Sequence, residues 1–170
     1  MQVYGSISPH VMNIMAVAIM EEQFHKHMLD SLPSFEWCKH IFSHSVSVEL
    51  QNSELVPSNI SYHFSERCIG YSLDNADLVF VPACKNRYWY VVIANMRERR
   101  FEVICPFKDL NIVKEDAFVI VSNFRKVFKF SYPASRRVDV YRMGFAFASV
   151  SNSTSQYVFF TSPQLSRKIL

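Results

Sequence analysis

Glycine is scarce in this chain. Three of its 170 residues are glycine, Gly5, Gly70 and Gly144, where average usage near 7 % would give about twelve. Phosphate-cradling motifs such as G-x-G-x-x-G and G-x-x-x-x-G-K-[ST] need closely spaced glycines, because their backbones approach the phosphate directly. The three glycines of this chain are too far apart to form either motif. The sequence therefore excludes a Rossmann or P-loop nucleotide-binding enzyme.

Long hydrophobic runs and a strong net charge are also missing. The longest apolar run, Val11 to Met20, is interrupted by Asn13 and is only about half of the roughly 20 residues that span a bilayer. The formal net charge of +3 is too small to indicate by itself a nucleic-acid or membrane partner. We therefore expect no association with a membrane.

The N-terminus shows no positively charged, apolar, small-residue series, so no secretory signal is predicted. We accordingly expect an intracellular protein, nuclear or cytoplasmic. In those compartments thiols stay reduced, which predicts that none of the four cysteines forms a disulfide. They are Cys38, Cys68, Cys84 and Cys105.

The chain is rich in apolar side chains, at 49 % of all residues, with 15 % aromatic. A single core accommodates chains of up to roughly 250 to 300 residues. We therefore expect one domain over residues 1–170. No repeat or low-complexity segment divides it.

Hydrophobic periodicity predicts the elements of this domain. A helix is predicted from Ser8 to Leu32, followed by a shorter helix from Ser34 to Ser47 and a polar loop at Pro57. Short runs rich in β-branched and aromatic residues predict buried strands at 78–82, 88–93 and 101–105, the last two as an antiparallel pair. Strands are also expected at 138–141 and 145–147, and a last element from Tyr157 to Phe160.

The clearest helix is predicted between Asn111 and Lys129. Apolar residues recur there every three or four positions on one face, at Ala117, Ile120, Val121, Phe124, Val127 and Phe128. The opposite face is expected to carry Lys114, Glu115, Asn123 and Lys126. Helices first, strands in the middle and helices afterwards predict an α+β fold rather than alternating βαβ units.

The segment from Asp77 to Phe107 resembles a known family. It reads D-L-V-F-V-P at 77–82, Y-W-Y-V-V-I at 88–93 and F-E-V-I at 101–104. This order resembles the centre of the ubiquitin-like-protein-specific cysteine proteases of the SUMO-protease type, especially a divergent branch spread by plant transposons. Their strands read like D-L-I-F-I-P, H-W-Y-L and V-L-D-S. The resemblance implies a papain-like α+β fold, with a small, mostly antiparallel sheet flanked by helices.

The family cleaves the C-terminal peptide or isopeptide bond of a small ubiquitin-like modifier with a His, Asp, Cys triad. The resemblance places Tyr88 at the His position, Cys105 at the Asp position and Tyr157 at the Cys position. A tyrosine phenol, with an ordinary pKa near 10, cannot replace an imidazole near 6.5 as a base at neutral pH. No cysteine follows Cys105 and no histidine follows His63, so a shifted alignment restores nothing.

The resemblance therefore implies a degenerate, inactive pseudoprotease, or a module that binds a SUMO-like modifier or another protein. Trp89 would then lie beside the groove that holds the modifier's Gly-Gly tail. No cofactor is expected. Relative to the family, both ends of the chain look trimmed.

Two other functions stay open at this point. An active cysteine peptidase with a rearranged site would use Cys105 or Cys84 as nucleophile and His63 as base, although the sequence gives no reason to bring His63 to either thiol. A basic and aromatic nucleic-acid module would use Tyr88 to Tyr90 and the basic clusters. These clusters, at Arg97, Arg99, Arg100, Arg136, Arg137, Arg167 and Lys168, are better explained by a solvated turn and loops.

One group of residues has spacing that could suit zinc. His40 and His44 would lie one helical turn apart, with Cys38 beside them and Cys68 further along the chain. Structural zinc sites more often use paired C-x-x-C knuckles, and Cys38 falls on the predicted apolar face. We expect a buried thiol beside solvent-facing imidazoles, and no metal.

Overall fold

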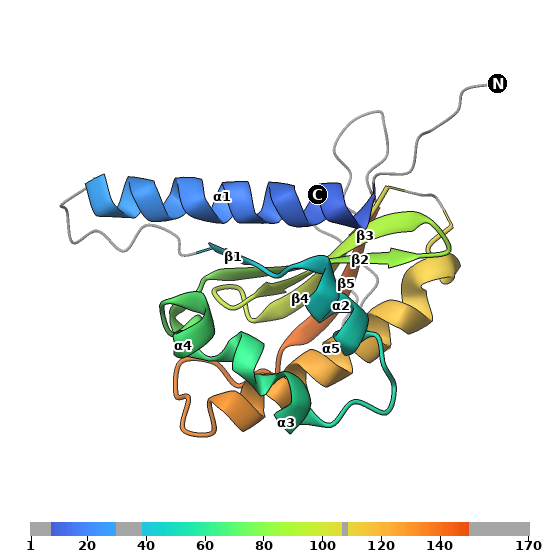
Figure 1. Cartoon of the computed structure of the whole chain (residues 1–170). Coiled ribbons are helices and arrows are strands. Elements are labelled where there is room, and N and C mark those ends of the chain that lie inside the picture. The colour runs from blue at the N-terminus through green and yellow to red at the C-terminus, as the bar shows by residue number, and fades with distance from the viewer. Residues whose placement is uncertain (1–7, 30–38, 107–108, 150–170) are drawn as a thin grey trace, which may run out of the picture.

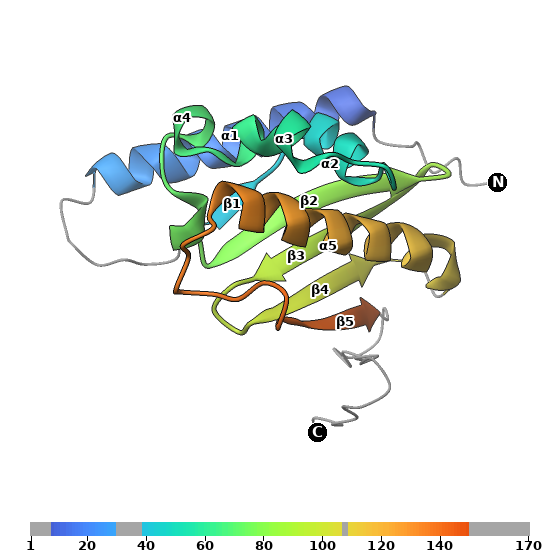
Figure 2. The same cartoon turned by 90° about the horizontal axis from the view of Figure 1, so that it is seen from below.

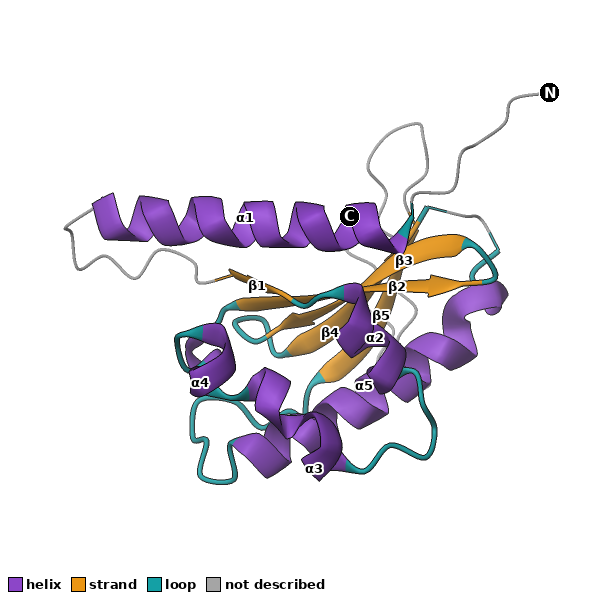
Figure 3. Cartoon of the chain, viewed as in Figure 1, coloured by secondary structure: helices purple, strands orange, loops and turns teal. Residues whose placement is uncertain are grey.

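A five-stranded mixed sheet lies between helices (Figures 1 and 3). The computed structural model describes residues 8–29, 39–106 and 109–149. The strands are β1 (Lys39–Ile41), β2 (Leu78–Lys85), β3 (Tyr88–Asn95), β4 (Arg100–Cys105) and β5 (Gly144–Ser149). The helices are α1 (Pro9–Leu29), α2 (His44–Leu50), α3 (Pro57–Ile60), α4 (Glu66–Ile69) and α5 (Asn111–Ser131), with 3-10 helices η1 (Ser61–Phe64) and η2 (Leu73–Asn75). The predicted α+β class is confirmed.

The strands lie in the order in which they occur in the chain, β1-β2-β3-β4-β5. β2, β3 and β4 form an antiparallel meander, which confirms the predicted antiparallel pairing of β3 with β4, while β1 and β5 run parallel to their neighbours at the two edges. Asn86 and Arg87 alone connect β2 to β3, with φ of 50° and 69°. Two such left-handed residues make a type I′ turn, whose twist matches that of the strands it joins.

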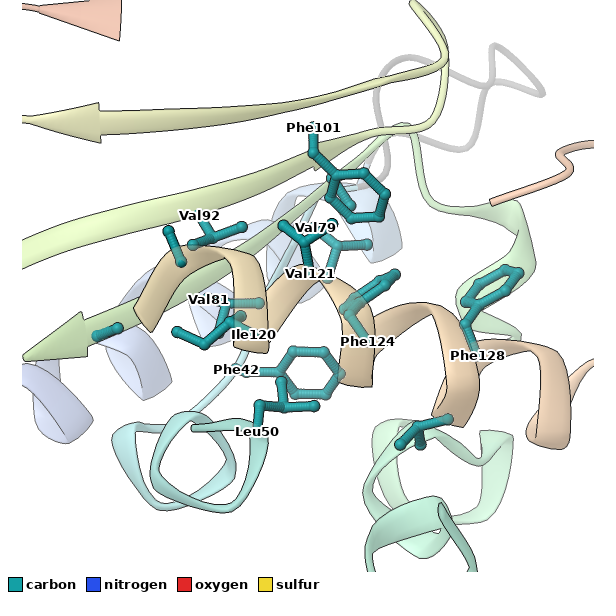
Figure 4. Close-up of a cluster of buried hydrophobic side chains, with 14 of the residues drawn as sticks. Phe42, Leu50, Val79, Val81, Val92, Phe101, Ile120, Val121, Phe124 and Phe128 are labelled. Atoms are coloured by element: carbon teal, nitrogen blue, oxygen red, sulfur yellow. The ribbon is translucent and has the colours of Figure 1, made fainter. Parts of the chain in front are cut away.

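Helix α5 lies across one face of the sheet (Figure 2). Side chains alternate between the two faces of a strand, and alternate residues of β2, β3 and β4 are buried beneath α5. Figure 4 shows this core, in which Phe124 meets Phe101 edge to face with ring centroids 5.5 Å apart. Burying one such side chain contributes about 1.5–3 kcal/mol, so the several buried side chains of α5 make a large contribution to the stability of the fold.

Helix α1 lies on the other side of the sheet, along its β1 edge (Figure 1). The backbone N–H of His44 donates to Asn13 Oδ1 at 2.7 Å, and that of Ile41 donates to Met20 Sδ at 3.3 Å. Ile14 and Val17 are each more than half exposed. Despite this apolar surface, no helix in the described ranges combines the length and hydrophobicity needed to cross a bilayer.

The predicted helix from Ser34 to Ser47 is wrong. Lys39–Ile41 is extended and pairs with Leu78–Phe80, and helix α2 begins only at His44. His40 is therefore buried on the core side of the sheet, with 6 % of its surface exposed. The predicted helix would have left its imidazole facing solvent. Three residues carry too little pattern to separate a strand from a helix, and their pairing with β2 is long-range. Cys38 lies outside the described residues.

Three further predictions need correction. Asn123, expected on the polar face of α5, is 1 % exposed, because its amide donates to the carbonyls of Leu50 at 3.0 Å and Asn52 at 2.7 Å. Residues 138–141 form a loop instead of a strand, with alternate residues turned inward. The polar loop expected at Pro57 contains the short helices α3, η1, α4 and η2. The strand at 145–147 is confirmed as part of β5.

Candidate functional site

Two of the positions that the sequence singled out lie at the same end of the sheet. Tyr88 is the first residue of β3, and Cys105 is the last residue of β4. One step beyond the Val91–Ile104 pair, antiparallel register places Cys105 opposite Tyr90. Tyr88 lies two residues from Tyr90 and thus shares its face. The third position, Tyr157, lies outside the described residues.

A buried carboxylate occupies this end of the sheet. Asp116, in the first part of α5, is 8 % exposed. Its Oδ2 accepts a hydrogen bond from the Tyr90 hydroxyl and another, at 2.6 Å, from Gln51 Nε2. Its Oδ1 lies 3.4 Å from Lys85 Nζ. A buried charge is tolerated only when it is paired and hydrogen-bonded, and Asp116 meets both conditions.

Gln51 joins this carboxylate to the backbone of the sheet. Its Nε2 also donates to the carbonyl oxygen of Cys84 at 3.1 Å. The amide therefore connects the end of α2 with the end of β2 and the start of α5. These contacts hold Tyr90, Asp116 and Lys85 together as one polar cluster, which we name the Asp116 cluster.

The Asp116 cluster fixes the protonation state of Tyr90. Burial raises the pKa of its phenol, and the hydrogen bond to the negatively charged Asp116 raises that pKa further. Tyr90 therefore remains a protonated donor across the physiological pH range. A phenol in this state stabilises a neighbouring carboxylate and does not act as a base.

Neither thiol of this region resembles an activated nucleophile. Cys105 is completely buried, so no substrate reaches its sulfur. Burial raises the pKa of the half-buried Cys84, and the negative charge of Asp116 acts in the same direction, against a lowering by the Arg87 backbone N–H. Catalytic cysteines need the opposite shift, since the thiolate is the nucleophile.

His63 is not near these thiols. It is an exposed residue of η1, whose neighbour Phe64 packs on Phe124 and accepts a hydrogen bond from the Tyr132 hydroxyl. Phe124 lies in the C-terminal half of α5 and Tyr132 directly follows this helix, whereas Asp116 lies near its beginning. At a rise of about 1.5 Å per residue, Asp116 and Phe124 are separated by about 12 Å along the helix.

Trp89 lies on the opposite face of β3 from Tyr90 and is half-buried. The imidazole of His44 meets its indole at an edge, with ring centroids 4.9 Å apart. Cys84 is the residue directly opposite Trp89 on β2. The surface around Trp89 is therefore built from the first residue of α2 and the ends of two strands.

The residues weighed as zinc ligands do not converge. His40 is on β1 and shares a hydrogen bond of 2.9 Å with the Tyr71 hydroxyl, while Cys68 is exposed on α4. Within the described ranges, no group of three or more His, Cys, Asp or Glu side chains could hold a metal ion. Cys68, Cys84 and Cys105 form no disulfide there.

Sequence reasoning missed the Asp116 cluster. Asp116 occurs at helical spacing with the apolar Val113, Ala117 and Ile120, and a carboxylate on an apolar face is a signal of a buried, partnered charge. Gln51 and Lys85 carry no comparable signal, because only tertiary folding brings them to Asp116.

No protein-family model and no curated protein matches this sequence. Solved structures do match in fold. SUMO protease Ulp1 with its catalytic cysteine oxidized to a sulfinic acid matches with a TM-score of 0.50 and 16 % identity over 80 % of this chain and 57 % of that chain. The sulfenic acid form matches with a TM-score of 0.50 and 15 % identity over 91 % and 68 %.

A structure described as the de-sumoylating protease matches with a TM-score of 0.53 and 11 % identity, over 85 % of this chain and 55 % of that chain. The chain thus has the fold of the SUMO proteases, as the strand pattern predicted. It covers 57 % of the length of the first of these structures.

Proposed function

We propose that this chain is a pseudoprotease, a domain with the SUMO-protease fold that cleaves no bond and binds a ubiquitin-like modifier. The proposal rests on the identity of the side chains at the candidate site. Tyr88 and Cys105 are the residues that the family resemblance assigns to the base and its orienting acid, and the side chains of the Asp116 cluster at this end of the sheet are already partnered.

Loss of catalysis follows from the chemistry of this cluster. Acyl transfer by cysteine needs a thiolate, a base that accepts its proton and a group that orients the base. Cys105 is inaccessible, the raised pKa of Cys84 favours its neutral thiol, and the only carboxylate of the cluster already accepts from Tyr90 and Gln51. Asp116 therefore has a structural role in place of a catalytic one.

The named structural neighbours are SUMO proteases, which supports a modifier of the ubiquitin-like kind as the partner. The surface around Trp89 is the place where we expect it to bind. Trp89 keeps the residue type of the resembled motif, and its indole contacts the imidazole of His44 while remaining partly exposed to solvent. Tryptophan is a frequent energetic centre of protein interfaces.

Catalysis is tested with a SUMO vinyl sulfone probe, which traps a reactive cysteine as a covalent adduct. We expect no adduct by mass spectrometry, with an active SUMO protease as the positive control. An adduct that disappears in Cys84→Ala or Cys105→Ala would contradict the proposal and establish the rearranged peptidase.

Binding is tested separately by calorimetric titration of SUMO into the full chain. We expect Trp89→Ala to weaken binding about tenfold, which corresponds to about 1.4 kcal/mol. Phe130→Ala is the matched control, because it removes an aromatic ring that is 55 % exposed near the end of α5. Trp89→Phe keeps a ring against His44, so it tests the site if the alanine variant does not fold. No binding by the unaltered chain would overturn the modifier-binding part of the proposal.

A further inference from the structure

Four arginines that are far apart in the sequence surround one hollow at the other end of the sheet. Its volume is about 210 Å³, and it is lined by Arg99, Arg136, Arg137, Asp139 and Arg142. Arg99 ends the turn between β3 and β4, and the other four residues belong to the loop between α5 and β5. We name this feature the arginine hollow.

The two segments are joined by backbone contacts. The N–H of Gly144, at the start of β5, donates to the carbonyl of Arg99 at 3.1 Å. Figure 2 shows the loop after α5 passing beside the β3–β4 turn before it enters β5. The proximity of Arg99 to the loop is therefore a consequence of the parallel β4–β5 pairing and could not be seen in the sequence.

The loop is held rigidly beneath its charged side chains. Val138, Val140 and Met143 are each at most 6 % exposed, so three side chains of the loop are inserted into the core. The guanidinium of Arg125 also donates to the carbonyl of Met143 at 2.8 Å. The backbone that carries the charged side chains is therefore in place before a ligand binds, so that only the side chains themselves must be ordered on binding.

Two of the four guanidinium groups are already engaged. Arg137 pairs with Asp77 and donates to the carbonyl of Asp74 at 3.1 Å. Arg142 Nε lies 3.4 Å from Asp139 Oδ2. The side chains of Arg99 and Arg136, both exposed, have no ion pair or hydrogen bond to another residue of the described ranges.

The charge of the hollow selects a strongly anionic ligand. Its four guanidinium groups, the Asp139 carboxylate and the Asp77 carboxylate that pairs with Arg137 together leave a formal charge of +2. Arginine presents a planar fork of donors that matches the oxygens of phosphate and carboxylate. A phosphate monoester carries a charge of about −1.5 to −2 at pH 7 and three strongly accepting oxygens. A phosphate monoester can therefore accept hydrogen bonds from several guanidinium groups, whereas a carboxylate offers only two oxygens.

The size and lining exclude a larger ligand. The hollow is smaller than the roughly 300–1,000 Å³ of sites for whole small molecules, so it holds a single group. No aromatic side chain of the described ranges lines it, whereas single-stranded nucleic acids are bound by base stacking on aromatic residues. We propose that the arginine hollow binds one phosphate monoester group, with Arg99 and Arg136 as the two guanidinium groups available to it.

This site is independent of the surface around Trp89. β3 has eight residues, so at about 3.3 Å per residue its two ends are separated by about 25 Å. The two proposals can therefore fail or succeed separately.

The experiment titrates the folded chain at low ionic strength with inorganic phosphate, sulfate, a phosphoserine peptide and the same peptide without phosphate, using calorimetry. We expect phosphate, sulfate and the phosphoserine peptide to bind more tightly than the unphosphorylated peptide. The Arg99→Gln and Arg136→Gln variants should each lose about tenfold in affinity, as expected for one charge-assisted bidentate contact. If the phosphoserine peptide binds more tightly than inorganic phosphate, the phosphate group comes from a phosphorylated protein. If the two bind equally, the ligand is a free phosphate ester. Both outcomes support the site.

Arg87→Gln is the matched control. Arg87 is exposed, has a positive φ like Arg99 (69° and 53°), and belongs to the turn at the opposite end of β3. We expect its affinity for phosphate to stay within about twofold of that of the unaltered chain. Equal losses in all three variants would reveal a general charge effect and overturn the proposal. So would absence of binding by both phosphate and the phosphoserine peptide.

Discussion

The hydroxyl of Tyr90 on β3 donates a hydrogen bond to the carboxylate of Asp116 on α5. This contact lies at the end of the sheet where β3 begins and β4 ends, and it ties the sheet to its main covering helix. It is also the contact whose loss has the clearest expected consequence.

Removal of Asp116 should destabilise the fold. Asp116→Ala leaves the buried Tyr90 hydroxyl without its acceptor, and an unsatisfied buried group costs about 1–3 kcal/mol. We expect a decrease of about 2–3 kcal/mol in the unfolding free energy, measured by urea denaturation. Glu115→Gln, an exposed neighbour on the same helix, is the control and should change stability by less than about 0.5 kcal/mol.

A double-mutant cycle with Tyr90→Phe isolates this contact. We expect a coupling free energy of about 1 kcal/mol or more between the two positions, within the range for residues in direct contact. Strict additivity of Asp116→Ala and Tyr90→Phe would mean that the two side chains contribute independently, contrary to the geometry.

Stability should fall in mild acid because of His40. Burial lowers the pKa of His40 from 6.5 to about 4, so the unfolded chain takes up the proton first as the pH falls. The contribution of neutral His40 is complete above about pH 6.5 and is lost as the pH approaches 4. A shift of this size corresponds to roughly 3 kcal/mol.

The measurement is the unfolding free energy between pH 4 and pH 7.5 in the unaltered chain and in His40→Gln. In His40→Gln, the unfolding free energy should depend less on pH, because the contribution of His40 is missing, whatever the absolute stability of the variant. His63→Gln removes an exposed histidine and should keep the full slope. Identical slopes in the unaltered chain and His40→Gln would show that His40 is not the titrating group.

Glycine at position 87 should stabilise the β2–β3 turn. Arg87 has φ of 69°, and the left-handed conformation costs a residue with a side chain about 1–2 kcal/mol. Glycine avoids this cost but loses about 0.5–1 kcal/mol through its more flexible unfolded state. We therefore expect a net gain of about 0.5–1 kcal/mol for Arg87→Gly in thermal or urea unfolding.

The reverse change provides the comparison. Gly70 is the C-cap residue of α4. It has φ of 84° and no atom within 4 Å of an added Cβ. Gly70→Ala should therefore destabilise through backbone strain alone, by about 1 kcal/mol. A stabilising Gly70→Ala would disprove the assigned backbone conformation.

The three described thiols should differ in their rate of alkylation. Cys68 is exposed, Cys84 is half-buried with a raised pKa, and Cys105 is completely buried. Because the thiolate is the reacting species, we expect the order Cys68, then Cys84, with Cys105 reacting only after unfolding. Iodoacetamide labelling followed by peptide mass spectrometry measures each site. Rapid labelling of Cys105 in the native protein would contradict its burial and reopen a role in catalysis.

The sequence predicts elements whose pattern is local and long. The periodicity of α5 and the apolar strands β2, β3 and β4 are of this kind, and the pattern of these strands also indicates the family fold. β1 was missed because three residues take their conformation from β2, which lies distant in the chain. The buried Asn123 was missed because periodicity does not reveal the carbonyls of Leu50 and Asn52 that its amide reaches.

The candidate site was predictable only in part. Tyr88 and Cys105 could be placed by the strand pattern, whereas Gln51 and Lys85 join Asp116 only through the packing of α2 and β2 on α5. The arginine hollow has the same origin. Arg99 and Arg136 belong to separate basic clusters in the sequence, and the β4–β5 pairing brings them to one place.

The mixed sheet also has a consequence for the order of folding. Its central meander closes through short turns, so little loop-closure entropy opposes it. β5 can pair in parallel with β4 only after the chain has crossed over through α5, and β1 joins from a distant segment. The transition state for folding should therefore contain the meander and α5 without the two outer strands. Substitutions in β1 or β5 would then mainly accelerate unfolding, and those in β3 would slow folding.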